Sequence, residues 1–335
     1  MKDHLRLQIT LFLIAFISVS FTASHSRAEP ILIRFSHVVG ENTPKGMGAS
    51  MFKSLVEQRL GGRVVVEIYA QSQKFTDEQA LLGLLFGDVE MAAPSFPKFR
   101  KFSKRLQIFD LPFLFENTDE IHKFQKSQEG QQLLSSMEDL GIKGLRYWDN
   151  GMRIISATKP IKTPYDLKGL ILRIESSCIF QNQYSRLGAI AIPMPFKRLK
   201  DSLREGVVDG YENAWSNVLS NDLHLLRPYF TETGHSYLGY MLVTSKEFWD
   251  NLPPDISSEL NTILDEVTVE VNRLAVEKAS KDKSEILKNK NVQVVTLTES
   301  DKEAWRQVLL PTWRQYESEI GVELIELAKK AKANK

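Results

Sequence analysis

The sequence predicts an α/β fold of two lobes, and three observations lead to that prediction. Short runs rich in Val and Ile alternate with stretches at helical spacing, which is typical of α/β units with mainly parallel sheets. The chain has 335 residues, and at about 100–200 residues per domain this length favours two domains. A helical pattern over residues 253–287 is long enough to cross from one lobe to the other, which would make the lobes discontinuous in sequence.

The N-terminus has the three-part layout of a secretory signal peptide. Lys2 and Arg6 precede an uncharged run from Ile9 to Ala23, and Ser26-Arg27-Ala28 places small residues at positions −3 and −1 of a cut after Ala28. The run is shorter than the roughly 20 residues that a comfortable membrane span needs, although an uncleaved anchor remains the alternative. We therefore expect residues 1–28 to be removed and the mature protein to be exported to the periplasm.

The charge balance and the cysteine count exclude several classes of protein. The chain has 43 basic and 42 acidic residues, and without residues 1–28, which hold three basic and one acidic residue, 40 and 41 remain. This near-neutral balance gives no reason to expect nucleic acid as a partner. Cys178 is the only cysteine, so neither an internal disulfide nor a cysteine zinc cluster can form.

The first half of the mature chain alternates apolar strands with amphipathic helices. Gly61-Gly62 ends the first helical pattern, and Gly87 ends a second one. The predicted elements in this half are strands at 31–38, 64–69, 89–93 and 142–148, and helices at 47–60, 77–86, 118–126 and 129–140.

The second half repeats the alternation and adds the long helix. Thr163 is a capping residue, Pro164 suits a first helical turn, and Asp166 follows three residues after the cap. The predicted elements are strands at 153–157, 170–175, 207–212, 236–244 and 292–297, a short helix from 163, helices at 177–187, 196–205 and 253–287, and two C-terminal helices.

Arg173 interrupts the apolar stretch LKGLILRIESSC (167–178) near the carboxyl end of its predicted strand. Ligands of open α/β sheets bind beyond the carboxyl ends of strands, and the following helix start at Ser176-Ser177 offers free N–H groups to an anion. The planar guanidinium matches a carboxylate. The sequence thus predicts an anion site, and the alternative is an arginine paired with an internal Asp or Glu.

Arg153 follows the turn Asp149-Asn150-Gly151 and enters a predicted strand, so it is a second candidate to grip a diacid. A solvated arginine at a strand start is the alternative. The histidines show no metal-binding spacing, and no G-x-S-x-G, G-x-G-x-x-G or P-loop motif is present. The sequence therefore favours a binding site without reaction machinery, cofactor or metal.

Several motifs in order resemble the solute-binding proteins of the TRAP transporter family, in its DctP-like branch, over nearly all of the mature chain. The motifs are FSHVVGENTPKG (35–46), FGDVEMAAPS (86–95), IFDLPFLF (108–115), YWDNGMR (147–153), DLKGLILRIESS (166–177), LGAIAIPMPF (187–196) and LREGVVDGYENAWSN (203–217).

The resemblance implies a two-lobed, type II-like binding protein with mixed sheets flanked by helices and a long helix spanning both lobes. It implies lobe I at 29–150 plus about 239–280, and lobe II at 151–238 plus about 281–335. It also implies a monomer that binds an organic acid, most of all a C4-dicarboxylate such as malate, succinate or fumarate. The ligand would pass to a membrane permease of small and large subunits.

The resemblance also assigns site residues. Arg173 matches the family's carboxylate-binding arginine, Arg153 a second basic position near the ligand, Asn213 a carboxylate-binding asparagine, and Phe196 an aromatic wall. Further contacts expected from the first lobe are Lys45, Ser95, His37 and Trp148, each of which has a loop, capping or core interpretation as an alternative.

Three segments depart from the pattern of dicarboxylate binders. They are SQKFTDEQ (72–79), Glu175 where glutamine is usual, and Gly234 where asparagine is common. The departures leave the identity of the acid open. Two other functions also remain open, namely an enzyme of the same architecture and a sensor component that presents its ligand to a receptor.

Overall fold

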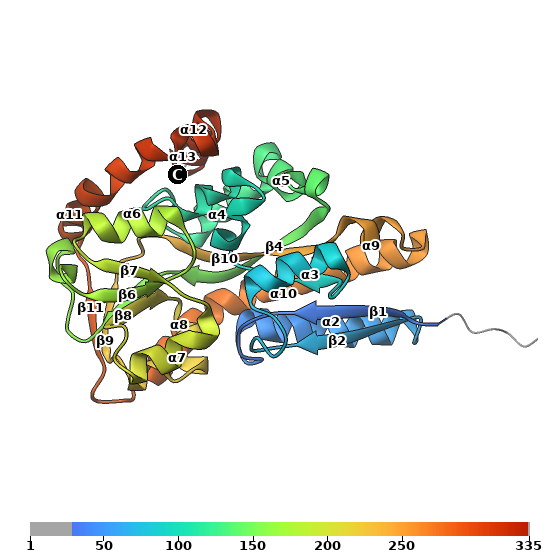
Figure 1. Ribbon diagram of the computed structural model, residues 1–335, viewed down its shortest axis with the longest axis horizontal. Coiled ribbons are helices and arrows are strands. Elements are labelled where there is room, and N and C mark those ends of the chain that lie inside the picture. The colour runs from blue at the N-terminus through green and yellow to red at the C-terminus, as the bar shows by residue number, and fades with distance from the viewer. Residues whose placement is uncertain (1–28, 334–335) are drawn as a thin grey trace, which may run out of the picture. The chain divides into compact units, whose positions relative to one another are not determined.

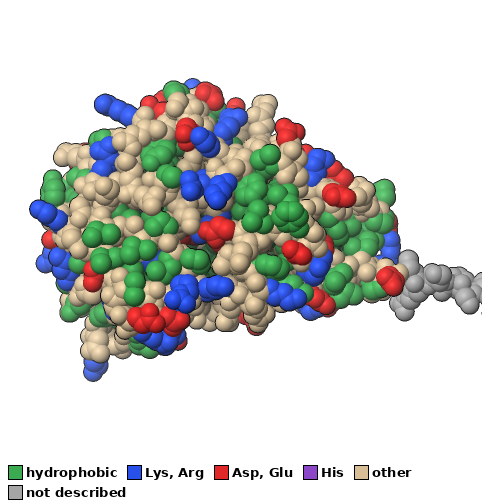
Figure 2. Space-filling model, in the orientation of Figure 1, with side chains coloured by type: hydrophobic (Ala, Val, Ile, Leu, Met, Phe, Trp, Pro, Cys, Tyr) green, Lys and Arg blue, Asp and Glu red, His purple; other side chains and the backbone are tan. Residues whose placement is uncertain are grey.

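The computed structural model describes residues 29–333, and the chain from Ile31 onward forms one compact unit (Figure 1). The predicted signal peptide, residues 1–28, lies outside the described residues. Among residues 29–333, no helix is both long enough and apolar enough to cross a membrane. On the face shown in Figure 2, acidic and basic side chains are interspersed, without a field of one sign.

The first sheet has five strands in the order β2-β1-β3-β10-β4. This is the type II order that the resemblance implied. Its strands are β1 (Ile31–Ser36), β2 (Val64–Tyr69), β3 (Met91–Ala92), β10 (Tyr237–Ser245) and β4 (Ile142–Met152). The helices in this part of the chain are α2 (Pro44–Leu60), α3 (Asp77–Phe86) and α9 (Lys246–Asp250).

The second sheet has six strands in the order β11-β9-β5-β8-β6-β7. Its strands are β11 (Gln293–Thr296), β9 (Tyr229–Glu232), β5 (Ile154–Ala157), β8 (Gly210–Asn213), β6 (Ile171–Ile174) and β7 (Ile190–Pro193). The helices α6 (Cys178–Arg186), α7 (Phe196–Arg204) and α8 (Trp215–Ser220) connect or follow these strands.

Both sheets are mixed. In the first sheet β1 runs parallel to β2 and β3, whereas β10 pairs antiparallel with β3 and β4. In the second, β6 runs parallel to β7 and β8 and β11 to β9, whereas β5 is antiparallel to β8 and β9. The antiparallel pairs all involve β5 or β10, the strands at which the chain enters one sheet from the other. The prediction of mixed sheets is thus confirmed. The expectation of mainly parallel pairing did not allow for the antiparallel pairs that β5 and β10 form.

The helix α10 (Pro254–Ile286) has 33 residues and packs against α2 and β4 of the first sheet and against α8 beside the second. Its buried residues include Ile256, Leu260, Leu264, Val267 and Val271, at the spacing of one helical face. The predicted long helix spanning both parts of the molecule is confirmed. Figure 1 shows it in orange, running below β10 and β4.

The remaining helices cover the side of the molecule near α6. They are α4 (Thr118–Lys126), α5 (Gln128–Ser135), α11 (Glu299–Leu309), α12 (Glu317–Ile320) and α13 (Val322–Ala333). α13 packs against α4, and α11 packs against α6. The helix predicted at 129–140 is too long, because α5 ends at Ser135 and only a 3-10 turn, Glu138–Leu140, follows before Gly141 at φ 82°.

Candidate functional site

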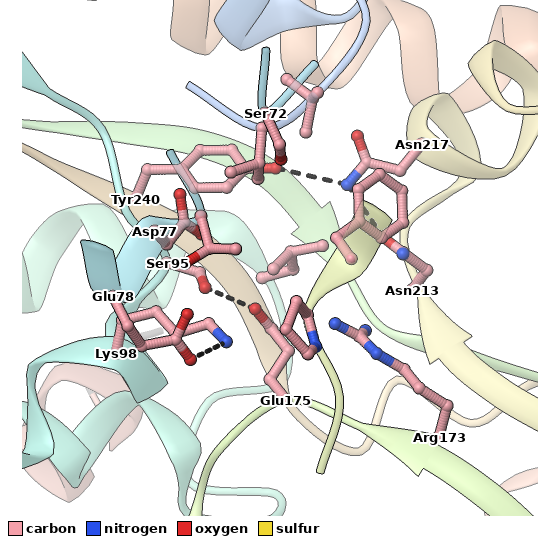
Figure 3. Close-up of a pocket in the computed structure, with 16 residues that line it drawn as sticks. Ser72, Asp77, Glu78, Ser95, Lys98, Arg173, Glu175, Asn213, Asn217 and Tyr240 are labelled. Carbon is pink, nitrogen blue, oxygen red and sulfur yellow. Dashed lines mark hydrogen bonds and ion pairs between the residues drawn. The ribbon is translucent and has the colours of Figure 1, made fainter. Parts of the chain in front are cut away.

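A pocket opens between the two sheets (Figure 3). Most of its walls come from the carboxyl ends of the strands β1, β2, β3, β6, β7 and β8 and the segments that follow them, where ligands of open α/β sheets bind. The strand β10 contributes Leu238 and Tyr240. The lining residues from the part of the molecule that holds the first sheet are Val38, Val39, Ser72, Thr76, Asp77, Glu78, Ser95, Lys98, Leu238 and Tyr240. Those from the part that holds the second sheet are Arg173, Glu175, Pro195, Phe196, Asn213 and Asn217.

Arg173 is a buried cation in the wall of this pocket. It lies at the carboxyl end of β6, is 2% exposed, and points its guanidinium into the pocket in Figure 3. Its Nε donates to the Met194 carbonyl oxygen at 2.9 Å, and within the described chain no carboxylate forms an ion pair with it. Burial lowers the pKa of Arg173, because the charged form is desolvated. The terminal nitrogens of the guanidinium are therefore available to an anion.

Phe196 and Asn213 complete the setting of that cation. The Arg173 Cζ lies 5.8 Å from the centroid of the Phe196 ring. The Asn213 Oδ1 accepts hydrogen bonds from Ala214 N and Asn217 Nδ2, both at 2.9 Å. With its oxygen engaged in this way, the Asn213 amide presents its NH₂ group to the pocket. A guanidinium and an amide donor together suit a carboxylate.

Arg153 lies between β4 and β5 and forms ion pairs with two internal carboxylates. It forms a close ion pair with Glu175 and a second one with Glu212, Nη1 to Oε1, at 3.4 Å. Ser95 Oγ donates to the other oxygen of Glu175. Burial alone would raise the pKa of Glu175, but the charges of Arg153 and Lys98 outweigh it and lower that pKa to about 2. Glu175 therefore stays ionised in the pocket.

The wall from the first part of the chain carries two more carboxylates, Asp77 and Glu78, at the start of α3. Glu78 Oε1 accepts from Lys98 Nζ at 2.7 Å and from Ser176 Oγ at 3.0 Å. The Asp77 carboxylate, by contrast, accepts no hydrogen bond from the described residues. The pocket thus combines a free guanidinium with an unpaired carboxyl group.

Four of the residues predicted from the sequence line the pocket: Arg173, Asn213, Phe196 and Ser95. The other four do not. Arg153 is paired as described, and Lys45 is fully buried outside the pocket lining. The Lys45 Nζ donates to the Ala93 carbonyl oxygen at 2.8 Å and sits 3.7 Å from the centroid of the Tyr240 ring.

His37 and Trp148 are buried away from the pocket lining. Both ring nitrogens of His37 are buried and have no hydrogen-bond partner in the described part of the chain. Burial lowers the pKa of His37 to about 3, so the ring is neutral. Trp148 packs in the core against Phe35, and its Nε1 donates to Thr268 Oγ1 at 3.0 Å. A ligand contact by any of the eight residues stays a prediction.

Sequence reasoning missed several lining residues, among them Asp77, Glu78, Lys98, Asn217 and Tyr240. A signal existed for the first two. Thr76 and Gln79 form a capping box, in which Gln79 N donates to Thr76 Oγ1 at 3.3 Å and Thr76 N donates to Gln79 Oε1 at 2.9 Å. This box fixes the start of α3 at the end of the segment that follows β2. Lys98 lies in a 3-10 helix (Phe96–Lys101), which leaves no periodic pattern in the sequence.

Comparisons with known proteins place this chain in a family. The model of the family described as bacterial extracellular solute-binding protein, family 7 (DctP), matches residues 35–319. The chain belongs to the DctP family. Members of this family are substrate-binding proteins of transporters that act outside the cytoplasm, and the fold class predicted from the sequence is theirs.

Two relatives are similar along most of their length. The C4-dicarboxylate-binding periplasmic protein DctP of Shewanella loihica is 42% identical over 91% of this chain and 90% of its own. A TRAP periplasmic solute-binding protein from Shewanella oneidensis, solved with bound succinate, is 43% identical with a TM-score of 0.89, covering 90% of this chain and 99% of that one.

A third relative is a TRAP periplasmic solute-binding protein from Pseudomonas aeruginosa, solved with bound L-malate. It is 42% identical with a TM-score of 0.83, covering 86% of this chain and all of that one. The solute-binding role predicted from the sequence is therefore confirmed.

Proposed function

We propose that this protein captures a C4-dicarboxylate, such as succinate, malate or fumarate, in the pocket of Figure 3 and delivers it to a membrane permease of small and large subunits. The observation that carries the proposal is Arg173. Its charge is buried beside the pocket, and among residues 29–333 no carboxylate forms an ion pair with it. A buried cation without an ion-pair partner is costly, and a ligand carboxylate would reduce that cost.

The proposed binding mode places one ligand carboxylate on Arg173 and Asn213. The guanidinium provides two parallel donors, the Asn213 NH₂ group provides a third, and Phe196 covers one side. Because the pocket lies between segments of both sheets, closing them around a ligand would bury it. The ligand must then bind the closed arrangement more tightly than the open one.

The relatives support the choice of ligand class. The Shewanella loihica protein is named for C4-dicarboxylates, and the two solved relatives hold succinate and L-malate. We further propose that residues 1–28 are cleaved off after Ala28, and that the mature protein acts in the periplasm as a monomer and without a chemical step. The delivery partner follows from the TRAP relatives and is part of the same proposal.

A thermal-shift screen of ligand-free protein, residues 29–335, tests the ligand class. The panel holds mono-, di- and tricarboxylates, sugar acids and amino acids. A C4-dicarboxylate at 100 times its dissociation constant is expected to stabilise the protein by about 2.7 kcal/mol. A shift with sugar acids or amino acids alone would contradict the proposal, and turnover of malate would indicate an enzyme instead.

A further inference from the structure

Asp77 is an unpaired carboxyl group in the wall of the ligand pocket. It is the first residue of α3, is 6% exposed, and lies across the pocket from Arg173 in Figure 3. Its neighbour Glu78 is held by Lys98 and Ser176, whereas the Asp77 carboxylate accepts no hydrogen bond from the described residues. The group is therefore free to interact with whatever enters the pocket.

Among the described residues, none of the charged groups that face Asp77 forms an ion pair with it. The cations are Lys45 on α2 and Lys98 in the 3-10 helix, and the anions are Glu78 on α3 and Glu175 at the end of β6. Burial raises the pKa of Asp77 to about 6, and the two lysines only partly oppose it. At pH 7 this carboxyl group is ionised, but a modest change in its surroundings can protonate it.

A C4-dicarboxylate would supply that change. Its two carboxylates stand at opposite ends of the molecule, so when one lies on Arg173 the other points to the wall that holds Asp77. Two neighbouring carboxylates in a buried site cannot both stay ionised without a large cost, and sharing one proton removes most of it. A protonated Asp77 can also donate a hydrogen bond to the ligand.

We infer that Asp77 takes up one proton from solvent when a C4-dicarboxylate enters the pocket, so that Asp77 selects for a diacid and couples its capture to pH. The inference rests on the proposed function, because it requires a ligand with a second carboxylate. Glu175 does not compete for this role, since it stays ionised between Arg153 and Ser95.

Among the charged groups that face Asp77, Lys45 also titrates near neutral pH, because burial lowers its pKa to about 8. At pH 7 a group with that pKa is already about 90% protonated, so it can gain only about 0.1 proton. Asp77, with a pKa of about 6, is about 10% protonated at pH 7 and can gain about 0.9. The amount of proton taken up at pH 7 therefore distinguishes the two groups.

Isothermal titration calorimetry with fumarate tests the inference, since both fumarate carboxyls are ionised at and above neutral pH. Titrations at pH 7 in buffers of different ionisation enthalpy give the number of protons taken up. We expect between about 0.5 and 0.9 proton per fumarate for the wild-type protein, and a dissociation constant that rises up to about tenfold per pH unit above pH 7.

The matched variants are Asp77→Asn and Glu78→Gln, which alter adjacent pocket carboxyls of which only Asp77 lacks a partner. Proton uptake is expected to fall to about 0.1 or less in Asp77→Asn and to persist in Glu78→Gln, whatever the affinity of either variant. Tight fumarate binding by the wild type without proton uptake overturns the inference and leaves the proposed function intact. Uptake that persists in Asp77→Asn assigns the proton to another group and also overturns it. Failure of fumarate, succinate and malate to bind overturns both proposals.

Discussion

Replacing Arg173 with methionine is expected to weaken dicarboxylate binding by a factor of about 10² or more while the protein keeps its stability. The Arg173 guanidinium makes one hydrogen bond, to Met194, and no ion pair with the described residues. The substitution removes that bond, and its loss destabilises the protein by about 1 kcal/mol. It also removes a desolvated charge, and that removal stabilises the protein. The free energy of unfolding should therefore stay within about 1 kcal/mol of the wild-type value or rise.

The expected loss of affinity is much larger. Arg173 would provide two charge-assisted hydrogen bonds to a ligand carboxylate, each worth about 1.5–3 kcal/mol. Their loss amounts to about 3–6 kcal/mol, which weakens binding by a factor of about 10² to 10⁴. Isothermal titration calorimetry with succinate measures the affinity, and urea unfolding without ligand measures the stability.

Arg153 is the matched control because it is equally buried but paired with Glu175 and Glu212. Replacing it with methionine leaves two buried carboxylates without their cation and is expected to cost about 3–5 kcal/mol. At about 2 °C for each kcal/mol, the melting temperature falls by about 6–10 °C. The reasoning is refuted if Arg173→Met destabilises the protein as much as Arg153→Met, or if it still binds succinate tightly.

Three further predictions address charge, pH and packing. Glu175→Gln should tighten dicarboxylate binding about tenfold in calorimetry, because it removes a negative charge near Arg173, and an unchanged or weaker affinity would speak against this. Burial raises the pKa of Asp110 to about 8 from its ordinary 3.8, so the folded protein holds a proton that the unfolded chain has released. Stability should thus fall as pH rises from about 4 to 8, and urea unfolding at both ends of this window should show a smaller fall in Asp110→Asn; an equal fall would exclude Asp110 as the cause. In Gly48→Ala the added Cβ would lie 2.3 Å from Val271 Cγ2, where α2 packs against α10. The free energy of unfolding should therefore fall by about 1–3 kcal/mol in thermal unfolding, whereas an unchanged melting temperature would mean that the two helices move apart without cost.

Local signals in the sequence predicted most elements of the fold. The helix α3 (Asp77–Phe86) was predicted to the residue, because Thr76 caps its start and Gly87, at φ 72°, ends it. The strand β9 (Tyr229–Glu232) was not predicted. It has four residues and its partners β5 and β11 lie far away in sequence, so its pairing depends on tertiary structure rather than on a local pattern.

The candidate site could be predicted only in part, for a similar reason. Arg173 could be identified as a candidate from the sequence alone, because it is a cation within an apolar strand. Nothing local, however, distinguishes it from Arg153, whose partners Glu175 and Glu212 are 22 and 59 residues away. The position of Asp77 across the pocket likewise results from the arrangement of two sheets, which the sequence pattern does not specify.

A crystal structure of the protein, residues 29–335, grown with succinate tests the central claim most directly. We expect one succinate in the pocket of Figure 3, with a carboxylate about 2.8 Å from both terminal nitrogens of Arg173 and within hydrogen-bonding distance of the Asn213 amide. Succinate bound elsewhere, or an empty pocket at saturating succinate, would contradict the assignment of Arg173 as the anchor.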